Sequence, residues 1–230
     1  MRAPCVYLIK AHQTTLLVKM EKLKVISFAL WGDAPKYNIG AIENAKIALQ
    51  IYPGWECWFY TGETTPKETI DELNKLDNVK IIPINESNDW TGMFWRFYSC
   101  SDPSVEVMLS RDCDSRLNER EKYAVEEWLD SDKNFHIMRD SWMHQAEIMG
   151  GMWGAKYPIL KDMKKLISEY TKGDFWQVDQ NFLREIVFPL IREDVMAHDE
   201  CMSWGPNNHK FPDKCPPRSE TFFVGQAFNL

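Results

Sequence analysis

The sequence predicts a single α/β domain in which a mostly parallel central sheet is flanked by helices. A chain of 230 residues can bury one core of ordinary size. In its N-terminal third, apolar runs of strand length alternate with segments of helical periodicity. Strand–helix–strand order of this kind is typical of parallel sheets with right-handed crossovers. We expect the domain to span residues 25–230, after an N-terminal extension of residues 1–24.

The first half of the chain contains three predicted strands, at residues 25–30, 55–60 and 79–84. Between the first two, apolar residues recur at helical spacing from Asn38 until Pro53 and Gly54 end the helix. A second helix is predicted to begin at a capping box formed by Thr65 and Glu68. This segment therefore predicts the Rossmann-like part of the sheet.

The second half opens with a fourth strand at residues 105–109, followed by a helix that Asn118 and Glu121 cap. A further strand is predicted at residues 135–138, and helices at 157–170 and 174–191. Pro189 is expected to strain the end of the last helix.

Composition excludes several classes of protein. The formal net charge of -7 argues against a nucleic-acid binder, which normally carries a basic face. The six cysteines show no paired spacing, so they indicate neither a zinc ribbon nor a disulfide framework, and they favour a reducing compartment. No apolar run approaches the length of a membrane span. We therefore expect a soluble, cytoplasmic protein.

The most informative motif is a pair of aspartates, Asp112 and Asp114, directly after the fourth strand. Open α/β sheets bind their ligands at the carboxyl ends of the strands. Carboxylate oxygens suit Mg²⁺ or Mn²⁺, and such ions are usually shared with the phosphates of a nucleotide. The other interpretation is a solvated loop that caps the next helix. Because the aspartates directly follow a central strand, the metal-site interpretation and the helix-cap interpretation have equal weight.

A glycine-rich segment, residues 149–154, surrounds Trp153. Gly150 and Gly151 would let the backbone approach a ligand while the indole stacks on a sugar ring. Spacing alone slightly favours a tight turn with a core tryptophan, whereas ten tryptophans in the chain favour a carbohydrate ligand.

Two further polar residues allow a functional and a structural interpretation. Asp179 lies on a helix whose apolar residues face inward, so its carboxylate could point into a cleft or merely interact with the helix dipole. His198 could be a structural residue or, as a neutral imidazole, complete the ligand set of Mn²⁺.

Taken in order, these groups resemble a nucleotide-sugar glycosyltransferase of the GT-A fold, and more narrowly a group found in giant algal viruses and bacteria. The resemblance covers residues 25–228 and includes a closing segment with Phe211-Pro212, Arg218 and Phe223-Val224-Gly225. One segment departs from it. Where the group has Arg-Asp-His-Pro-x-His, residues 139–144 read Arg-Asp-Ser-Trp-Met-His, so donor or acceptor preference could differ.

The resemblance implies an enzyme of the hexosyltransferase type. It would move a sugar from a nucleoside diphosphate sugar, with a UDP-sugar favoured, to a hydroxyl acceptor on a glycan. Its cofactor would be Mn²⁺ or Mg²⁺, held by Asp114 and His198, with Asp112 contacting the ribose or a metal-bound water. The catalytic candidates are Asp179 and Asp140.

The nucleotide-sugar contacts implied by the resemblance are Ala29, Leu30, Trp31, Tyr37, Arg111, Asp112, Gly151, Trp153, Gln180 and Arg218. A departing diphosphate also needs a nearby cation. The candidates for that cation are Arg111, Arg139 and Arg218.

Two alternative functions remain open. A sugar nucleotidyltransferase also uses a parallel sheet and paired acids, but it normally has a glycine-rich loop and a basic residue after the first strand. The segment from Trp31 to Lys36 matches that pattern poorly. A non-catalytic carbohydrate-binding module would keep the fold without turnover, and a transfer assay with a UDP-sugar distinguishes it from an enzyme.

Overall fold

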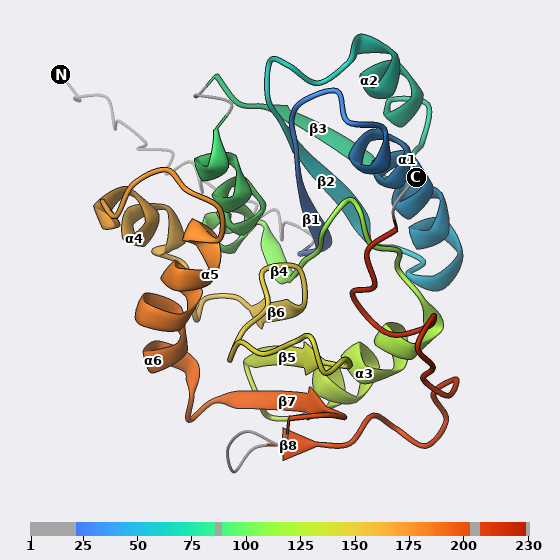
Figure 1. Cartoon of the computed structure of the whole chain (residues 1–230), viewed down its shortest axis with the longest axis vertical. Coiled ribbons are helices and arrows are strands. Elements are labelled where there is room, and N and C mark those ends of the chain that lie inside the picture. Colours follow the sequence, from blue (N-terminus) through green and yellow to red (C-terminus); the bar gives the residue numbers. More distant parts are fainter. Residues whose placement is uncertain (1–21, 86–88, 203–207, 229–230) are drawn as a thin grey trace, which may run out of the picture.

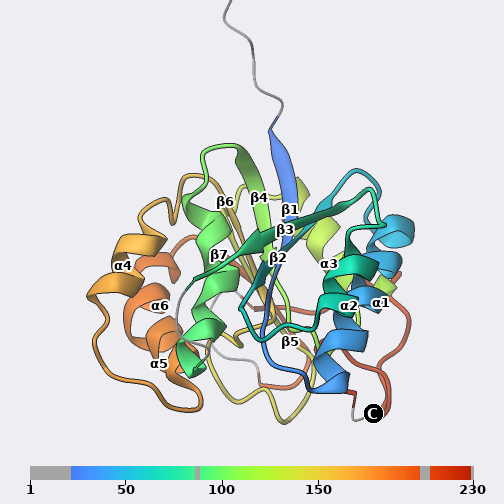
Figure 2. The same ribbon diagram turned by 90° about the horizontal axis from the view of Figure 1, so that it is seen from above.

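The computed structural model describes residues 22–85, 89–202 and 208–228, which build one eight-stranded sheet covered on both faces by helices (Figure 1). The strand order is β3-β2-β1-β4-β6-β5-β7-β8. Figure 2 shows α1, α2 and α3 on one face and α4, α5 and α6 on the other. The predicted α/β class with a mostly parallel sheet is confirmed. Most of the predicted extension, residues 1–21, lies outside the described residues, and β1 begins at Leu23.

The N-terminal half agrees with the prediction element by element. Its elements are β1 (Leu23–Leu30), α1 (Pro35–Ile51), β2 (Glu56–Thr61), α2 (Lys67–Leu73) and β3 (Val79–Pro83). All three strands pair in parallel. The predicted capping box of α2 is wrong, because the hydroxyl of Thr65 donates to the carbonyl oxygen of Leu30 at 2.9 Å instead.

The C-terminal half is more irregular. In chain order it contains a 3-10 helix η1 (Trp90–Ser101), β4 (Val105–Ser110), α3 (Glu119–Asp130), β5 (Phe135–Arg139), β6 (Trp153–Lys156), α4 (Met163–Glu169), α5 (Val178–Phe182), a wider π turn η2 (Leu183–Val187), α6 (Phe188–Ile191), β7 (Val195–Asp199) and β8 (Asn208–His209). The side chain of Asn118 caps α3, accepting a hydrogen bond from the backbone N–H of Glu121 at 3.0 Å.

Both late helices are shorter than predicted. Residues 157–162 form tight turns, with Lys161 N–H donating to the Pro158 carbonyl, so α4 begins only at Met163. Residue Gln177 has a φ of 71°, which a right-handed helix cannot contain, and α5 begins directly after it. Pro189 follows directly on the π turn η2, in which the Phe188 N–H donates to the Leu183 carbonyl oxygen, so the regular α-helical pattern is interrupted just before the proline, as expected.

Tryptophans fill the cores on both faces of the sheet. Trp58, Trp95 and Trp153 pack on the side of α4 to α6, and Trp128 packs on the side of α1 to α3. Each is at most 1 % exposed. Much of the tryptophan content therefore serves packing rather than carbohydrate binding. Among the described residues, no helix has the length and apolar character needed to cross a membrane.

The sheet has a switch point between β1 and β4. The chain runs from β1 outward to β2 and β3, then returns to place β4 on the opposite side of β1, parallel to it. Connections from these two neighbours leave in different directions, which opens a crevice at their carboxyl ends. The loop after β1 and the aspartate pair after β4 both lie at this edge.

Candidate active site

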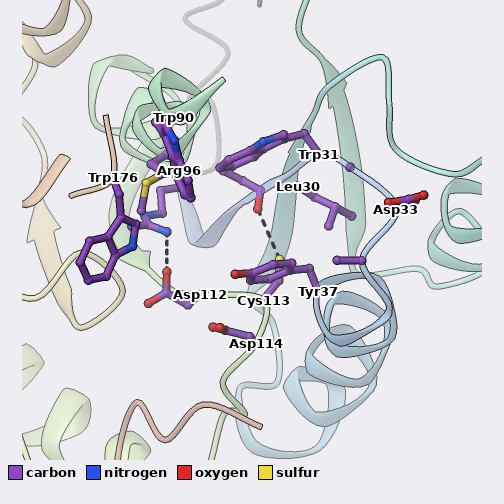
Figure 3. Close-up of a pocket in the computed structure, with 14 residues that line it drawn as sticks. Leu30, Trp31, Asp33, Tyr37, Trp90, Arg96, Asp112, Cys113, Asp114 and Trp176 are labelled. Carbon is purple, nitrogen blue, oxygen red and sulfur yellow. Dashed lines mark hydrogen bonds and ion pairs between the residues drawn. The ribbon is translucent and has the colours of Figure 1, made fainter. Parts of the chain in front are cut away.

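A cavity of about 400 Å³ lies at the carboxyl ends of β1 and β4 (Figure 3). Four segments of the chain line it: the end of β1 with the following loop and the start of α1, η1, the loop after β4, and the segment before α5. We call it the donor cavity, after the nucleotide-sugar donor that the sequence predicts. Its lining residues are Ala29, Leu30, Trp31, Gly32, Asp33, Ala34, Tyr37, Trp90, Met93, Arg96, Asp112, Cys113, Asp114 and Trp176.

Aromatic side chains form two sides of the donor cavity. Trp31 and Tyr37 come from the segment after β1, and Trp90 and Trp176 lie across from them in Figure 3. Trp176 is 64 % exposed and Trp90 45 %, so both offer faces to a ligand. Aromatic faces of this kind suit a planar base or the apolar face of a sugar.

The acidic floor of the cavity is paired with two cations. Asp112 Oδ1 accepts a hydrogen bond from Arg96 Nη1 at 2.5 Å, and Asp114 Oδ2 lies 3.3 Å from Lys36 Nζ. Burial, together with the negative charge of Asp112, raises the pKa of Asp114. Lys36 and Arg96 therefore offset only part of the burial cost and of the repulsion between the two carboxylates.

A second cavity of about 130 Å³ adjoins the first, and we call it the inner cavity. It shares Met93, Arg96, Asp112 and Trp176 with the donor cavity and adds His144, Met149, Gly150, Met152, Gln177, Asp179, Gln180 and Gly225. Asp179 Oδ2 accepts from Arg96 Nη2 at 2.7 Å. Burial raises the pKa of Asp179, and the Arg96 guanidinium opposes that rise. Burial also lowers the pKa of His144 to about 4, so this ring is neutral at pH 7.

The glycine pair makes room for the protein's own charged groups. A Cβ on Gly150 would lie 2.5 Å from Arg96 Nη2 and 2.7 Å from Asp179 Oδ2. On Gly151 it would lie 2.0 Å from Asp112 Oδ2. The close backbone approach that the sequence predicted therefore exists, but its partners are the acids and Arg96.

Several predicted site residues gather in these two cavities. Ala29, Leu30, Trp31, Tyr37, Asp112 and Asp114 line the donor cavity, and Asp179 and Gln180 line the inner one. Gln180 Oε1 accepts from the backbone N–H of Gly150 at 3.1 Å, which ties α5 to the glycine pair.

Arg111 and Trp153 lie outside the lining of both cavities. Arg111 is 2 % exposed; its Nε pairs with Glu121 at 3.1 Å and its Nη1 donates to the carbonyl oxygen of Trp153 at 3.1 Å. Trp153 is fully buried on β6 and stacks on Phe135 with ring centroids 5.2 Å apart. The core interpretation of this tryptophan was the correct one.

Asp140 forms a buried ion pair with Arg120 outside the lining of both cavities, and its catalytic role stays a prediction. Its two carboxylate oxygens accept from Arg120 Nε at 2.8 Å and Arg120 Nη2 at 2.9 Å, and Oδ2 also accepts from the Val224 N–H at 2.9 Å. Arg218 donates to the Asp140 carbonyl oxygen at 3.3 Å. These contacts fasten the C-terminal segment to α3 and β5.

The structure does not bring His198 to the aspartate pair. One row of paired residues crosses β4, β6, β5 and β7 in that order, and it consists of Ser110, Trp153, Ile137 and Ala197. Three strand spacings of about 4.8 Å separate the ends of that row by about 14 Å. His198 follows Ala197, and its ring nitrogens contact His136 Nε2 at 2.8 Å and Glu127 Oε2 at 3.1 Å. The structure therefore places His198 in contact with His136 and Glu127, away from the aspartate pair, and its ligand role stays a prediction.

The aspartate pair fits an ion shared with a substrate. Among the described residues, no group of three or more histidine, cysteine or acidic side chains is arranged to hold a metal by itself. Mg²⁺ commonly uses one or two carboxylates and completes its shell with water and substrate phosphates. Asp112 and Asp114, each with one oxygen paired to a cation, match that smaller requirement.

We expect His198→Ala to lower stability and leave the donor cavity intact. The substitution leaves the buried His136 ring without its partner, which costs about 1–3 kcal/mol, whereas the exposed Glu127 can bind water instead. Thermal unfolding and nucleotide binding measure the two effects. The control is His209→Ala, because His209 is a neighbouring but exposed histidine. This variant should change neither the melting temperature nor the affinity for nucleotide. A loss of nucleotide affinity in folded His198→Ala would contradict the structural role.

Sequence reasoning missed Arg96, Met93, Trp90 and Trp176. Arg96 is a single cation inside the aromatic run of residues 90–98. A buried arginine needs an acidic partner, and that requirement is the signal that could have linked it to Asp112.

Comparisons with known proteins agree with this architecture. No protein-family model matches the sequence, and no curated protein matches it. Among solved structures, the chain is similar to a glycosyltransferase involved in glycosylation of the major capsid of the virus PBCV-1. The identity is 18 %, the match covers 77 % of this chain and 81 % of that chain, and the TM-score is 0.52.

A second similar structure is the 4-diphosphocytidyl-2C-methyl-D-erythritol synthase of Anaerococcus prevotii. The identity is 11 %, the match covers 78 % of this chain and 89 % of that chain, and the TM-score is 0.50. Likeness at these identities concerns the fold. The predicted recognition is confirmed at that level: the chain has an α/β fold of the GT-A type.

Proposed function

We propose that the protein is a metal-dependent glycosyltransferase that moves a sugar from a nucleoside diphosphate sugar, with UDP favoured, to a hydroxyl group of a glycan acceptor. The observation that carries the proposal is the position of Asp112 and Asp114. They form the floor of an aromatic-walled cavity at the switch point of the sheet, where such folds bind nucleotides.

The donor cavity suits a nucleotide in size and lining. Ligand cavities of about 300–1,000 Å³ with mainly apolar walls and a few polar groups are typical of small-molecule sites. In this cavity the aromatic walls would take the base and ribose, and the acidic floor would face the diphosphate. Asp112 and Asp114 would hold Mn²⁺ or Mg²⁺.

The chemistry of the step depends on the charge of the leaving group. A bound ion would neutralise the negative charge that develops on the departing diphosphate. Lys36 and Arg96 lie against the same carboxylates and add positive charge. These two residues replace Arg111, Arg139 and Arg218 as the candidate cations.

Asp179 is the candidate group on the acceptor side. It lines the inner cavity, where Arg96 supports its ionised form. If the anomeric configuration inverts, Asp179 would take the proton of the acceptor hydroxyl, and if it is retained, Asp179 would orient the sugar.

The test is thermal unfolding with UDP-glucose and other nucleoside diphosphate sugars, each with Mn²⁺ or with excess chelator. A ligand at 100 times its dissociation constant stabilises the fold by about 2.7 kcal/mol. For a chain of this size that free energy corresponds to roughly 5–11 °C in melting temperature. We expect the shift only when the ion is present. An equal shift in chelator would contradict the metal-dependent site.

One observation favours nucleotidyl transfer as the second candidate. Lys36, a basic residue in the segment after β1, reaches Asp114 at the floor of the donor cavity. Incubation with a nucleoside triphosphate and a sugar 1-phosphate decides between the two. Release of pyrophosphate indicates a nucleotidyltransferase, whereas release of UDP from a UDP-sugar in the presence of acceptor indicates a glycosyltransferase.

A further inference from the structure

A single buried arginine separates and contacts the two cavities. Arg96 lines both of them, and its side chain is 6 % exposed. Its Nη1 lies 2.5 Å from Asp112 Oδ1 and its Nη2 lies 2.7 Å from Asp179 Oδ2. Figure 3 shows the Arg96 guanidinium directed at Asp112 from η1. One cation is thus shared by an acid of the donor cavity and an acid of the inner cavity.

The geometry requires an arginine. A guanidinium presents two N–H groups in a fixed plane, whereas a lysine ammonium is a single point charge on a flexible stem. The backbone at Gly150 closes over the guanidinium so tightly that a Cβ there would lie 2.5 Å from Nη2. Arg96 is therefore held in one orientation by η1, the loop after β4, the glycine pair and α5.

The charges explain what this arrangement does. Asp179 is fully buried, and leaving such a carboxylate without its cation is strongly unfavourable. The same guanidinium also lies against Asp112, so its charge opposes any second cation at the aspartate pair. The two acids and one arginine carry a combined formal charge of -1.

We propose that Arg96 is a positioning residue that couples the two cavities, by holding Asp112 and Asp179 in fixed places with one cation. This inference rests on the proposed function, which gives Asp112 to the donor and Asp179 to the acceptor. Arg96 itself acts through the two carboxylates. Its removal changes the donor and acceptor sides together.

The proposal predicts effects of opposite sign in Arg96→Met. Loss of the positive charge makes the aspartate pair more attractive to a divalent ion, so Mn²⁺ alone should bind about tenfold tighter. Transfer should fall by about 10²-fold or more, because displacement of a reacting group by about 1 Å costs that much. Loss of a residue that only stabilised the fold would lower the melting temperature and change neither Mn²⁺ affinity nor transfer per folded molecule.

The variant Arg96→Lys separates charge from geometry. The ammonium keeps the charge, so Mn²⁺ affinity should remain within about threefold of wild type, but it cannot bridge two carboxylates, so transfer should still fall by about tenfold or more. The matched control is Arg120→Lys, since Arg120 is also 6 % exposed and pairs with a fully buried aspartate, Asp140. Arg120→Lys should lower the melting temperature and change neither Mn²⁺ affinity nor transfer per folded molecule.

Titration of Mn²⁺ by electron paramagnetic resonance at pH 8, without nucleotide, measures the first effect on the full chain. Weaker or unchanged Mn²⁺ binding in folded Arg96→Met overturns the proposal. If the wild type neither binds Mn²⁺ nor transfers sugar, the proposed function fails, and a melting-temperature cycle of Arg96→Met and Asp179→Asn decides the coupling. If Arg96 and Asp179 stabilise each other, the melting temperature of the double variant falls by less than the sum of the two single decreases. Additive decreases overturn the proposal.

Discussion

Asp114→Asn should lower sugar transfer by about 10²-fold or more while leaving the protein folded. The amide keeps the volume of the side chain and removes its charge, and loss of one electrostatic stabiliser of a leaving group costs about this much. Steady-state transfer from a UDP-sugar in Mn²⁺, normalised to folded protein, measures the effect.

Stability should hardly respond to Asp114→Asn. Burial raises the pKa of Asp114, so the native fold disfavours the charged form and a neutral amide relieves that cost. The lost partner is Lys36, in a partly exposed pair worth about 0–1 kcal/mol. Glu43→Gln is the control, because it removes a carboxylate from the Arg116 ion pair on α1 and should alter neither property. Unfolding of Asp114→Asn with normal activity per folded molecule would make this aspartate a cap.

Asp179→Asn should separate binding from chemistry. We expect the affinity for UDP and Mn²⁺ to stay within a few-fold of wild type, because the donor cavity and its aspartate pair keep their charges. Transfer should fall by roughly 10²-fold or more, the order of a general-base contribution. Calorimetric titration with UDP and Mn²⁺, and transfer rates on the same preparation, measure the two quantities.

A buried acid outside the cavities supplies the control for Asp179. Asp199 pairs with Arg139 Nε at 2.8 Å and its side chain is fully buried, so Asp199→Asn removes a comparable ion pair. It should lower the melting temperature and leave transfer per folded molecule unchanged. If Asp179→Asn behaves in the same way, with a normal rate and lowered stability, its role is structural.

The parallel part of the fold was predictable because its signals are local. Short apolar runs define β1 to β4, and strands that run in parallel place their carboxyl ends at one edge of a sheet. For that reason the loop after β1 and the pair Asp112 and Asp114 could be assigned to one site. Trp153 was ambiguous, since glycines flank core strands and ligand loops alike.

The remaining part of the site depends on contacts across long stretches of chain. Arg96 meets Asp112 across 16 residues and Asp179 across 83, and no periodic pattern connects them. It also lies on a 3-10 helix, whose three-residue repeat departs from ordinary helical spacing. His198 and Asp199 together look like a sequence motif. The structure nevertheless places His198 on β7, three strands along the sheet from β4, which precedes the aspartate pair.

The glycine pair has a consequence for attempts to rebuild this site in another protein. Gly150 and Gly151 carry no functional group, yet a methyl group at either position would overlap atoms of Arg96, Asp179 or Asp112. Grafting the three charged residues onto a different α/β scaffold would therefore fail unless two residues without side chains faced them. A design that transfers this site must therefore include the two glycines together with the acids that they contact.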